Sequence, residues 1–122
     1  MIWQELSLVL MDDPGMARVH EAHLGAHRPT DVISFVYPPM PGTDAGHTGE
    51  VLVNVERAAN EGPKHQGASE ELALYIAHGC QHLIGAEDHT PLLRARMRRV
   101  ERRWLRKAAA AGLITPLALR PA

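Results

Sequence analysis

The feature that most constrains the fold is a run of apolar residues at helical spacing in the second half of the chain. Its members recur at steps of one, three and four residues: Leu72, Tyr75, Ile76, Gly79 and Leu83. This spacing predicts a helix with one buried face, capped by Ser69 at its start and ended by Gly85 in a left-handed conformation. A helix with such a stripe has to pack against another element, so it is expected at the centre of the core.

Two histidines lie at the border of this stripe. His78 and His82 are four residues apart, so they lie one turn apart on the same side of the helix. A turn at Gly85 would bring His89 back toward them. Three imidazoles with an open fourth position are typical of a catalytic zinc site. The pattern therefore predicts one zinc ion held by His78, His82 and His89, with Asp88 as an alternative ligand.

The residue after the first histidine limits the chemistry. It is Gly79, so the zinc-protease signature H-E-x-x-H and its built-in general base are absent. This argues against a peptidase and leaves either a metal hydroxide acting directly or a base from elsewhere. Glu87, Asp88 or Glu50 could accept hydrogen bonds from the imidazole N–H groups.

The remaining chain predicts a small α/β (α+β) domain. Apolar and β-branched runs at 6–11, 32–37 and 49–55 are expected to be strands, and the Pro/Gly-rich loop 38–46 predicts that the last two are neighbours. Helices are expected over 14–24, 56–61 and 91–111, with Thr90 capping the last. Strands and helices do not alternate strictly. We therefore expect one domain, 1–122, with a small mixed β-sheet covered by helices and the histidines on a central helix.

Charge is distributed unevenly. The net charge is −1, but 94–107 holds eight Lys or Arg against one Glu, a local +7 that leaves −8 elsewhere. A polyanionic partner is one interpretation, because arginines bind phosphate bidentately; an exposed helix that is basic only for solubility is the other. Aromatic residues are only 4% of the chain, so nucleic-acid binding would depend on the backbone and on salt.

Cysteine content and hydropathy predict a cytoplasmic protein. A single cysteine, Cys80, excludes an internal disulfide, the N-terminus lacks a basic signal-peptide region, and no apolar run reaches the roughly 20 residues that span a bilayer. Three further histidines, at 20, 23 and 27, are interpreted as packing or surface residues, with a second metal site as the less favoured alternative.

Three blocks of this sequence resemble the YbeY family of metal-dependent endoribonucleases. Residues 78–89 are similar to the motif H-G-x-L-H-L-x-G-Y-D-H, residues 29–35 to P-T-[DN]-V-[LI]-S-F, and residues 49–51 to G-[DE]-[IV]. The resemblance implies a YbeY-like metal-dependent hydrolase domain over 1–122, with zinc on His78, His82 and His89. It also implies RNA as substrate in ribosomal RNA maturation and the small ribosomal subunit as a partner.

Two departures from the family pattern bear on the site. His89 follows His82 by seven positions where the family has six, and Leu24 stands at the position of a family arginine. Arg28 is the expected substitute, as the catalytic residue that holds phosphate. The leading hypothesis is a zinc-dependent endoribonuclease in which a metal-activated water attacks an RNA phosphodiester. The alternatives are a non-catalytic zinc-binding module associated with RNA or the ribosome, and a metal hydrolase of a smaller substrate.

Overall fold

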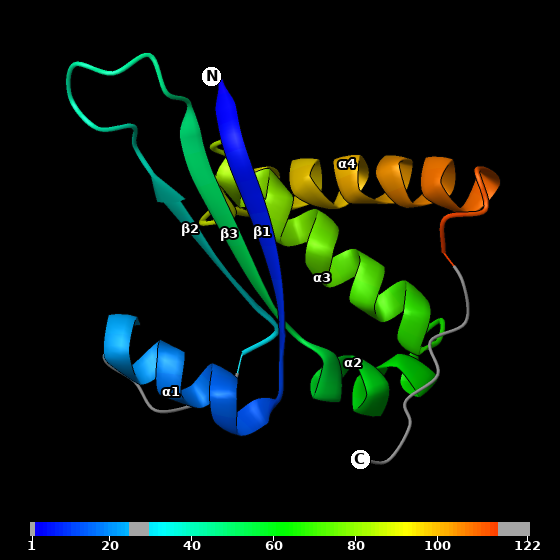
Figure 1. Cartoon of the computed structure of the whole chain (residues 1–122). Helices are drawn as coiled ribbons and strands as arrows, with labels where there is room; N and C mark the ends of the chain where they lie inside the picture. The colour runs from blue at the N-terminus through cyan, green and yellow to red at the C-terminus, as the bar shows by residue number, and fades with distance from the viewer. Residues whose placement is uncertain (1, 25–29, 115–122) are drawn as a thin grey trace.

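A three-stranded mixed sheet carries helices on both of its faces (Figure 1). The structure is a computed structural model that describes residues 2–24 and 30–114. The elements follow in the order β1 (Trp3–Met11), α1 (Asp13–Leu24), β2 (Val32–Tyr37), β3 (His47–Asn54), α2 (Val55–Glu61), the 3₁₀ turn η1 (Gly62–Lys64), α3 (Ala68–Leu83) and α4 (Pro91–Ala110). The central strand β3 runs parallel to β1 and antiparallel to β2, as the predicted mixed sheet and neighbouring strands require.

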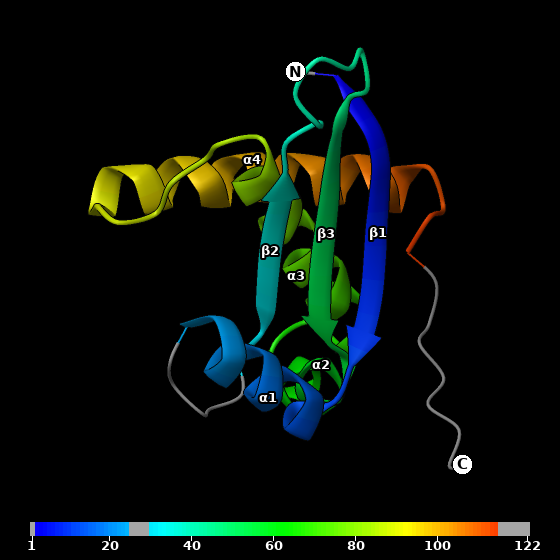
Figure 2. The same cartoon turned by 60° about the vertical axis from the view of Figure 1, so that its left-hand side comes forward.

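Alternation along β3 divides the core between two faces. Val51 and Val53 point to the face that α3 covers, where they pack with Tyr75 and Leu83. Leu52 points the other way and packs with Met16 of α1. Figure 2 shows α3 behind the sheet and α1 in front of its lower end. The predicted central helix is therefore confirmed, and it is held by the buried stripe from which it was inferred.

Gly79 allows α3 to approach the sheet closely. A Cβ at this position would lie 2.6 Å from Val51 Cγ1 and 2.8 Å from Val32 Cγ2, so no larger residue fits without movement. The Ser34 hydroxyl donates to the Gly79 carbonyl oxygen over 2.8 Å. These contacts bring the histidine-bearing part of α3 against the start of β2.

The ends of the helices confirm two expected caps and correct a third. Gly85 has φ +93° and follows α3 in a Schellman motif, with Gly85 N–H donating to His82 O and Ala86 N–H to Gln81 O. Thr90 caps α4 by accepting from Leu93 N–H. Ser69 is not the cap of α3: the cap is Gly67, two residues earlier, whose φ of +110° turns the chain out of η1, and the helix begins at Ala68.

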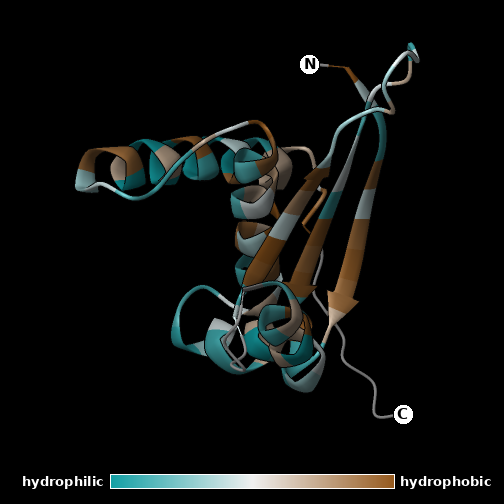
Figure 3. Cartoon of the chain, turned by 90° about the vertical axis from the view of Figure 1, so that its left-hand side faces the viewer, coloured by the Kyte–Doolittle hydropathy of each residue, from teal (hydrophilic) through white to brown (hydrophobic). Residues whose placement is uncertain are grey.

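The long helix α4 packs on α3 across one end of the sheet (Figure 1). Its inward side is apolar at Met97, which is 3% exposed, and most of its remaining surface is charged. Figure 3 shows the most hydrophobic segments gathered in the strands, while α4 alternates between hydrophobic and hydrophilic residues. No helix among the described residues is long and apolar enough to cross a membrane.

Candidate metal centre

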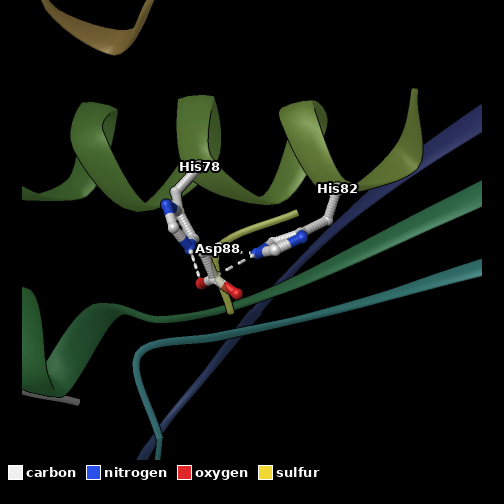
Figure 4. Close-up of side chains that lie close together, drawn as sticks. All are labelled: His78, His82 and Asp88. Carbon is white, nitrogen blue, oxygen red and sulfur yellow. Dashed lines mark hydrogen bonds and ion pairs between the residues drawn. The ribbon is translucent and has the colours of Figure 1, made fainter. Parts of the chain in front are cut away.

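His78 and His82 of α3 point to one place, and the turn after the helix brings Asp88 back to it (Figure 4). The two Nε2 atoms lie 3.1 Å apart, and each is 3.6 Å from Asp88 Oδ2. The spacing of four residues places the imidazoles one turn apart, and the Schellman turn at Gly85 reverses the chain. Local helix geometry thus assembles two of the three groups, and a glycine turn supplies the third.

The separations fit a bound divalent ion. Two ligand atoms about 2.0–2.1 Å from a zinc ion, at the tetrahedral angle, lie roughly 3.3–3.4 Å from each other. The three observed separations of 3.1, 3.6 and 3.6 Å bracket this value. Two imidazoles and one carboxylate are also a donor set that zinc takes in hydrolases, so the residues present fit the ion.

Each imidazole is held from behind. His78 Nδ1 lies 2.6 Å from Glu101 Oε1, a carboxylate of α4 that is 4% exposed, and His82 Nδ1 lies 3.0 Å from the carbonyl oxygen of Ala86. An acceptor at Nδ1 keeps the proton there and leaves the Nε2 lone pair for a metal. The hydrogen bond to Glu101 is the main reason that the pKa of His78 lies above the ordinary imidazole value, against an opposing effect of burial.

A cavity of about 450 Å³ opens over the three groups. Its opposite wall is the start of β2 and the residues before it, including Thr30, Asp31 and Ser34. Asn54 holds this wall, since its Nδ2 donates to the Thr30 carbonyl oxygen over 3.3 Å and its backbone N–H donates to the Asp31 carbonyl. Arg57 pairs with the Asp31 carboxylate at 2.6 Å. The centre is therefore reachable by a ligand through a polar opening.

Comparison with known proteins agrees with the family resemblance of residues 29–35, 49–51 and 78–89. The sequence model of the family described as Endoribonuclease YbeY matches residues 2–109. The chain belongs to the YbeY family. Endoribonuclease YbeY of Rhodopirellula baltica is 38% identical over 98 residues, which are 75% of this chain and 47% of that protein. The Wolinella succinogenes protein is 36% identical over 87 residues, 70% of this chain and 59% of its own length.

The chain therefore spans between about half and three fifths of the length of these two relatives. The Salinibacter ruber YbeY protein is 33% identical over 106 residues, covering 82% of this chain and 68% of that one. The solution structure of TM1509 from Thermotoga maritima has the same fold, with a TM-score of 0.59 at 20% identity over 87% of this chain and 69% of that chain. The predicted α+β class is confirmed.

The third histidine of the YbeY motif does not lie in the cluster of this chain. His89 has a 66% exposed side chain, and its Nδ1 is 3.4 Å from Glu87 Oε2. Asp88 follows His82 by six positions, the spacing at which the family motif has its third histidine, and its Oδ2 lies 3.6 Å from each of the two Nε2 atoms. His89 as a ligand thus stays a prediction, and the geometry favours the alternative, Asp88.

Two of the other expected residues are placed in different surroundings. Glu87 pairs with His89 rather than with His78 or His82, and Glu50 lies within β3, paired in register with Phe35. Arg28, the expected catalytic arginine, lies outside the described residues, as does His27. His20 is 9% exposed, and the His23 ring packs on Phe35 with ring centroids 5.0 Å apart. Both histidines therefore agree with the expected packing role.

Glu101 was not among the site residues expected from the sequence. It is the single acid of the basic segment, and it follows the buried Met97 by four residues, on the same side of α4. An acidic residue at a position that the helical spacing predicts to be buried indicates a paired carboxylate, because a buried charge requires a partner. That partner is His78.

Proposed function

We propose that this chain is a zinc-dependent endoribonuclease that acts in the maturation of ribosomal RNA. The observation that carries the proposal is the convergence of two histidine Nε2 atoms and a carboxylate oxygen within 3.6 Å, each imidazole fixed from behind. Membership of the YbeY family supplies the substrate class. The expected setting is the cytoplasm, with the small ribosomal subunit as partner, and the unit is one metal-dependent hydrolase domain over 1–122.

The ion would be held by His78, His82 and Asp88. A bound divalent ion acidifies water and neutralises charge that develops on a phosphodiester, which is the chemistry that hydrolysis requires. Glu101 holds the His78 ring in place and favours the tautomer with its proton on Nδ1. Thr30 and Asp31 line the opposite wall of the cavity and would face the bound ion and the substrate.

Arg28 is proposed to bind the phosphate of the substrate. It precedes Thr30 by two positions, and Thr30 lines the cavity over the histidines. A guanidinium forms paired hydrogen bonds with phosphate oxygens, so one arginine near this wall would do the work of the family arginine that Leu24 replaces. Cleavage by an Arg28→Ala variant should fall while its zinc content stays equal to that of the parent chain.

Cleavage of single-stranded RNA by zinc-loaded protein tests the proposal. The rate should fall by at least about 100-fold in His82→Ala, because the ion loses one of three ligands. His23→Ala, which changes a histidine on the opposite face of the sheet, is the matched control and should cleave as the parent does. Equal cleavage by all three proteins would point to a contaminating nuclease and remove the proposal.

The third ligand has its own test. Asp88→Ala should lose bound zinc, whereas His89→Ala should keep about one ion per chain. Metal content by mass spectrometry and the visible spectrum of the cobalt-loaded protein report the ligands without any need for activity. Zinc lost from His89→Ala and kept in Asp88→Ala would instead assign the third position to the histidine of the YbeY motif.

One observation favours a second candidate, a non-catalytic zinc-binding module associated with RNA or the ribosome. Leu24 stands where the family has an arginine, so the guanidinium that would contact phosphate is missing at this position of the sequence. Such a module would hold zinc and bind RNA with a strong dependence on salt, but leave the RNA intact. The cleavage assay above separates the two functions.

A further inference from the structure

A second pocket, of about 690 Å³, lies between α3 and α4 beside the metal centre. We call it the α3–α4 pocket; its walls include His65, Glu71, Tyr75, Arg102, Leu105 and Arg106. Asp31 lines this pocket and also the cavity over His78, His82 and Asp88, so the two adjoin at that residue. The volume lies in the range of small-ligand sites, roughly 300–1,000 Å³.

The wall from α3 is polar and fixed. Glu71 is 7% exposed, and its carboxylate accepts a hydrogen bond from the Tyr75 hydroxyl over 3.2 Å and lies 3.1 Å from His65 Nδ1. With the proton of His65 on Nδ1, its Nε2 is an acceptor on a side chain that is 57% exposed. Carboxylate and imidazole together present acceptors of the kind that read the amino and N–H groups of a nucleobase.

The wall from α4 is cationic. Arg102 and Arg106 are exposed, and their spacing of four residues places both guanidinium groups on one side of the helix. None of the ion pairs formed between described residues includes either arginine. Leu105 and Leu74 line the pocket between the charged walls and provide an apolar surface for a flat ring.

We propose that the α3–α4 pocket binds one nucleotide of the RNA strand, next to the nucleotide whose phosphate lies at the metal centre. Arg102 and Arg106 hold its phosphate, Leu74 and Leu105 contact the base, and Glu71 with His65 contacts the edge of the base. The proposal rests on RNA as the substrate class of the proposed function.

A matched pair of double variants tests the phosphate contacts. Arg102→Ala/Arg106→Ala removes two charges from the pocket, and Arg103→Ala/Lys107→Ala removes two charges one position further along the same helix, outside the pocket. Both are helix-compatible changes. The probe is a fluorescent single-stranded RNA oligonucleotide, and its binding is followed by anisotropy with the full chain kept free of zinc by a chelator, so that cleavage does not shorten the probe.

The pocket pair should weaken binding by at least about 10-fold, and the control pair by less than about threefold, because bidentate contacts exceed diffuse attraction. Equal losses in both variants would show that α4 attracts RNA only through its overall charge, and would overturn the proposal. Poly-glutamate that competes with the RNA and depends on the same two arginines would overturn the assignment of a nucleotide.

A third variant fills the pocket without changing its charge. Leu74→Trp should weaken RNA binding to a similar extent, about 10-fold, while melting temperature and zinc content stay near those of the parent. Unchanged RNA affinity in a folded Leu74→Trp protein would exclude a base from the pocket.

The outcomes for the pocket and for the proposed function are separable. RNA that binds through Arg102 and Arg106 but is never cleaved would keep the pocket and remove the endoribonuclease. Zinc-dependent cleavage with no difference between the two double variants would keep the enzyme and remove the pocket.

Discussion

Two imidazole–carboxylate pairs, His65–Glu71 and His78–Glu101, involve residues of α3 or lie just before it. They differ in the groups that lie close to Nε2 of the imidazole. His65 Nδ1 lies 3.1 Å from Glu71, and His78 Nδ1 lies 2.6 Å from Glu101. Both carboxylates are buried. Nε2 of His78, however, is within 3.6 Å of another imidazole and of a second carboxylate. The His65 side chain is 57% exposed, against 32% for His78.

The comparison shows that a buried carboxylate orients an imidazole but does not by itself create a metal site. Among the described residues, the one group of three potential ligands with atoms within 4.8 Å of one another is His78, His82 and Asp88. Helical spacing and the turn at Gly85 supply the extra donors at that end of α3. The other pair instead forms part of the wall of the α3–α4 pocket.

The largest difference is expected for zinc content. His78→Ala should reduce bound zinc from about one ion per chain to nearly none, because only two ligands remain. His65→Ala is the matched change at the other pair and should leave zinc content unaltered. Metal analysis after gel filtration measures both, and zinc loss in both variants would mean that the two pairs are coupled and that the comparison is wrong.

A smaller loss is expected when the carboxylates are changed. Glu101→Gln should weaken zinc binding by roughly 10- to 100-fold, since the residue behind a ligand orients it and raises its basicity. Competition with a chromophoric chelator measures the affinity. Glu71→Gln is the control and should leave zinc affinity unchanged. An equal loss of zinc affinity in both variants would show that Glu101 has no specific role at His78.

Gly79 tests how far the histidine-bearing end of α3 depends on close packing. Gly79→Ala should lower the free energy of unfolding by about 1–3 kcal/mol, because its Cβ would overlap Val51 and Val32. Thermal unfolding measures the loss. Ala73→Gly, at a half-buried position near the other end of α3, removes a methyl group instead and should cost about 1 kcal/mol through helix propensity. A stability unchanged by Gly79→Ala would show that α3 is free to move off the sheet.

The smallest expected effect concerns the hydroxyl of Tyr75, the donor to Glu71. Burial, together with the charges of Asp31 and Glu71, raises the pKa of Tyr75. Because the folded pKa is raised, the related stability is complete below the unfolded value of about 10 and is lost as pH rises through the folded value.

A Tyr37→Phe variant leaves Tyr75 as the only tyrosine, so its ionisation can be followed by absorbance. The tyrosinate band should appear only well above pH 10 in folded protein and near pH 10 in urea, which is the ordinary range of tyrosine. Coincident titrations in the two solvents would show that neither Glu71 nor burial raises the pKa of Tyr75.

Much of the fold could be predicted because its signals are local. The stripe from Leu72 to Leu83 predicted the central helix, the Pro/Gly loop predicted the pairing of β2 with β3, and Gly85 predicted the left-handed turn. Ser69 was wrongly expected to cap α3, because Gly67 already turns the chain at a position that only its positive φ reveals.

The candidate site could be predicted only in part. A spacing of four residues places His78 and His82 side by side in any α-helix, so the sequence by itself determined that pair. Family membership also followed from short blocks of sequence, and the match over residues 2–109 confirms it.

Tertiary structure decided the rest. The turn after Gly85 directs Asp88 toward the two imidazoles, whereas His89 pairs with Glu87, and the sequence left both residues open as the third ligand. Glu101 reaches His78 only because α4 packs across α3, 23 residues away in the chain. The sequence determined which helix carries His78 and His82. Long-range packing determined which carboxylates lie beside them, because the distances between these side chains depend on contacts that no local spacing defines.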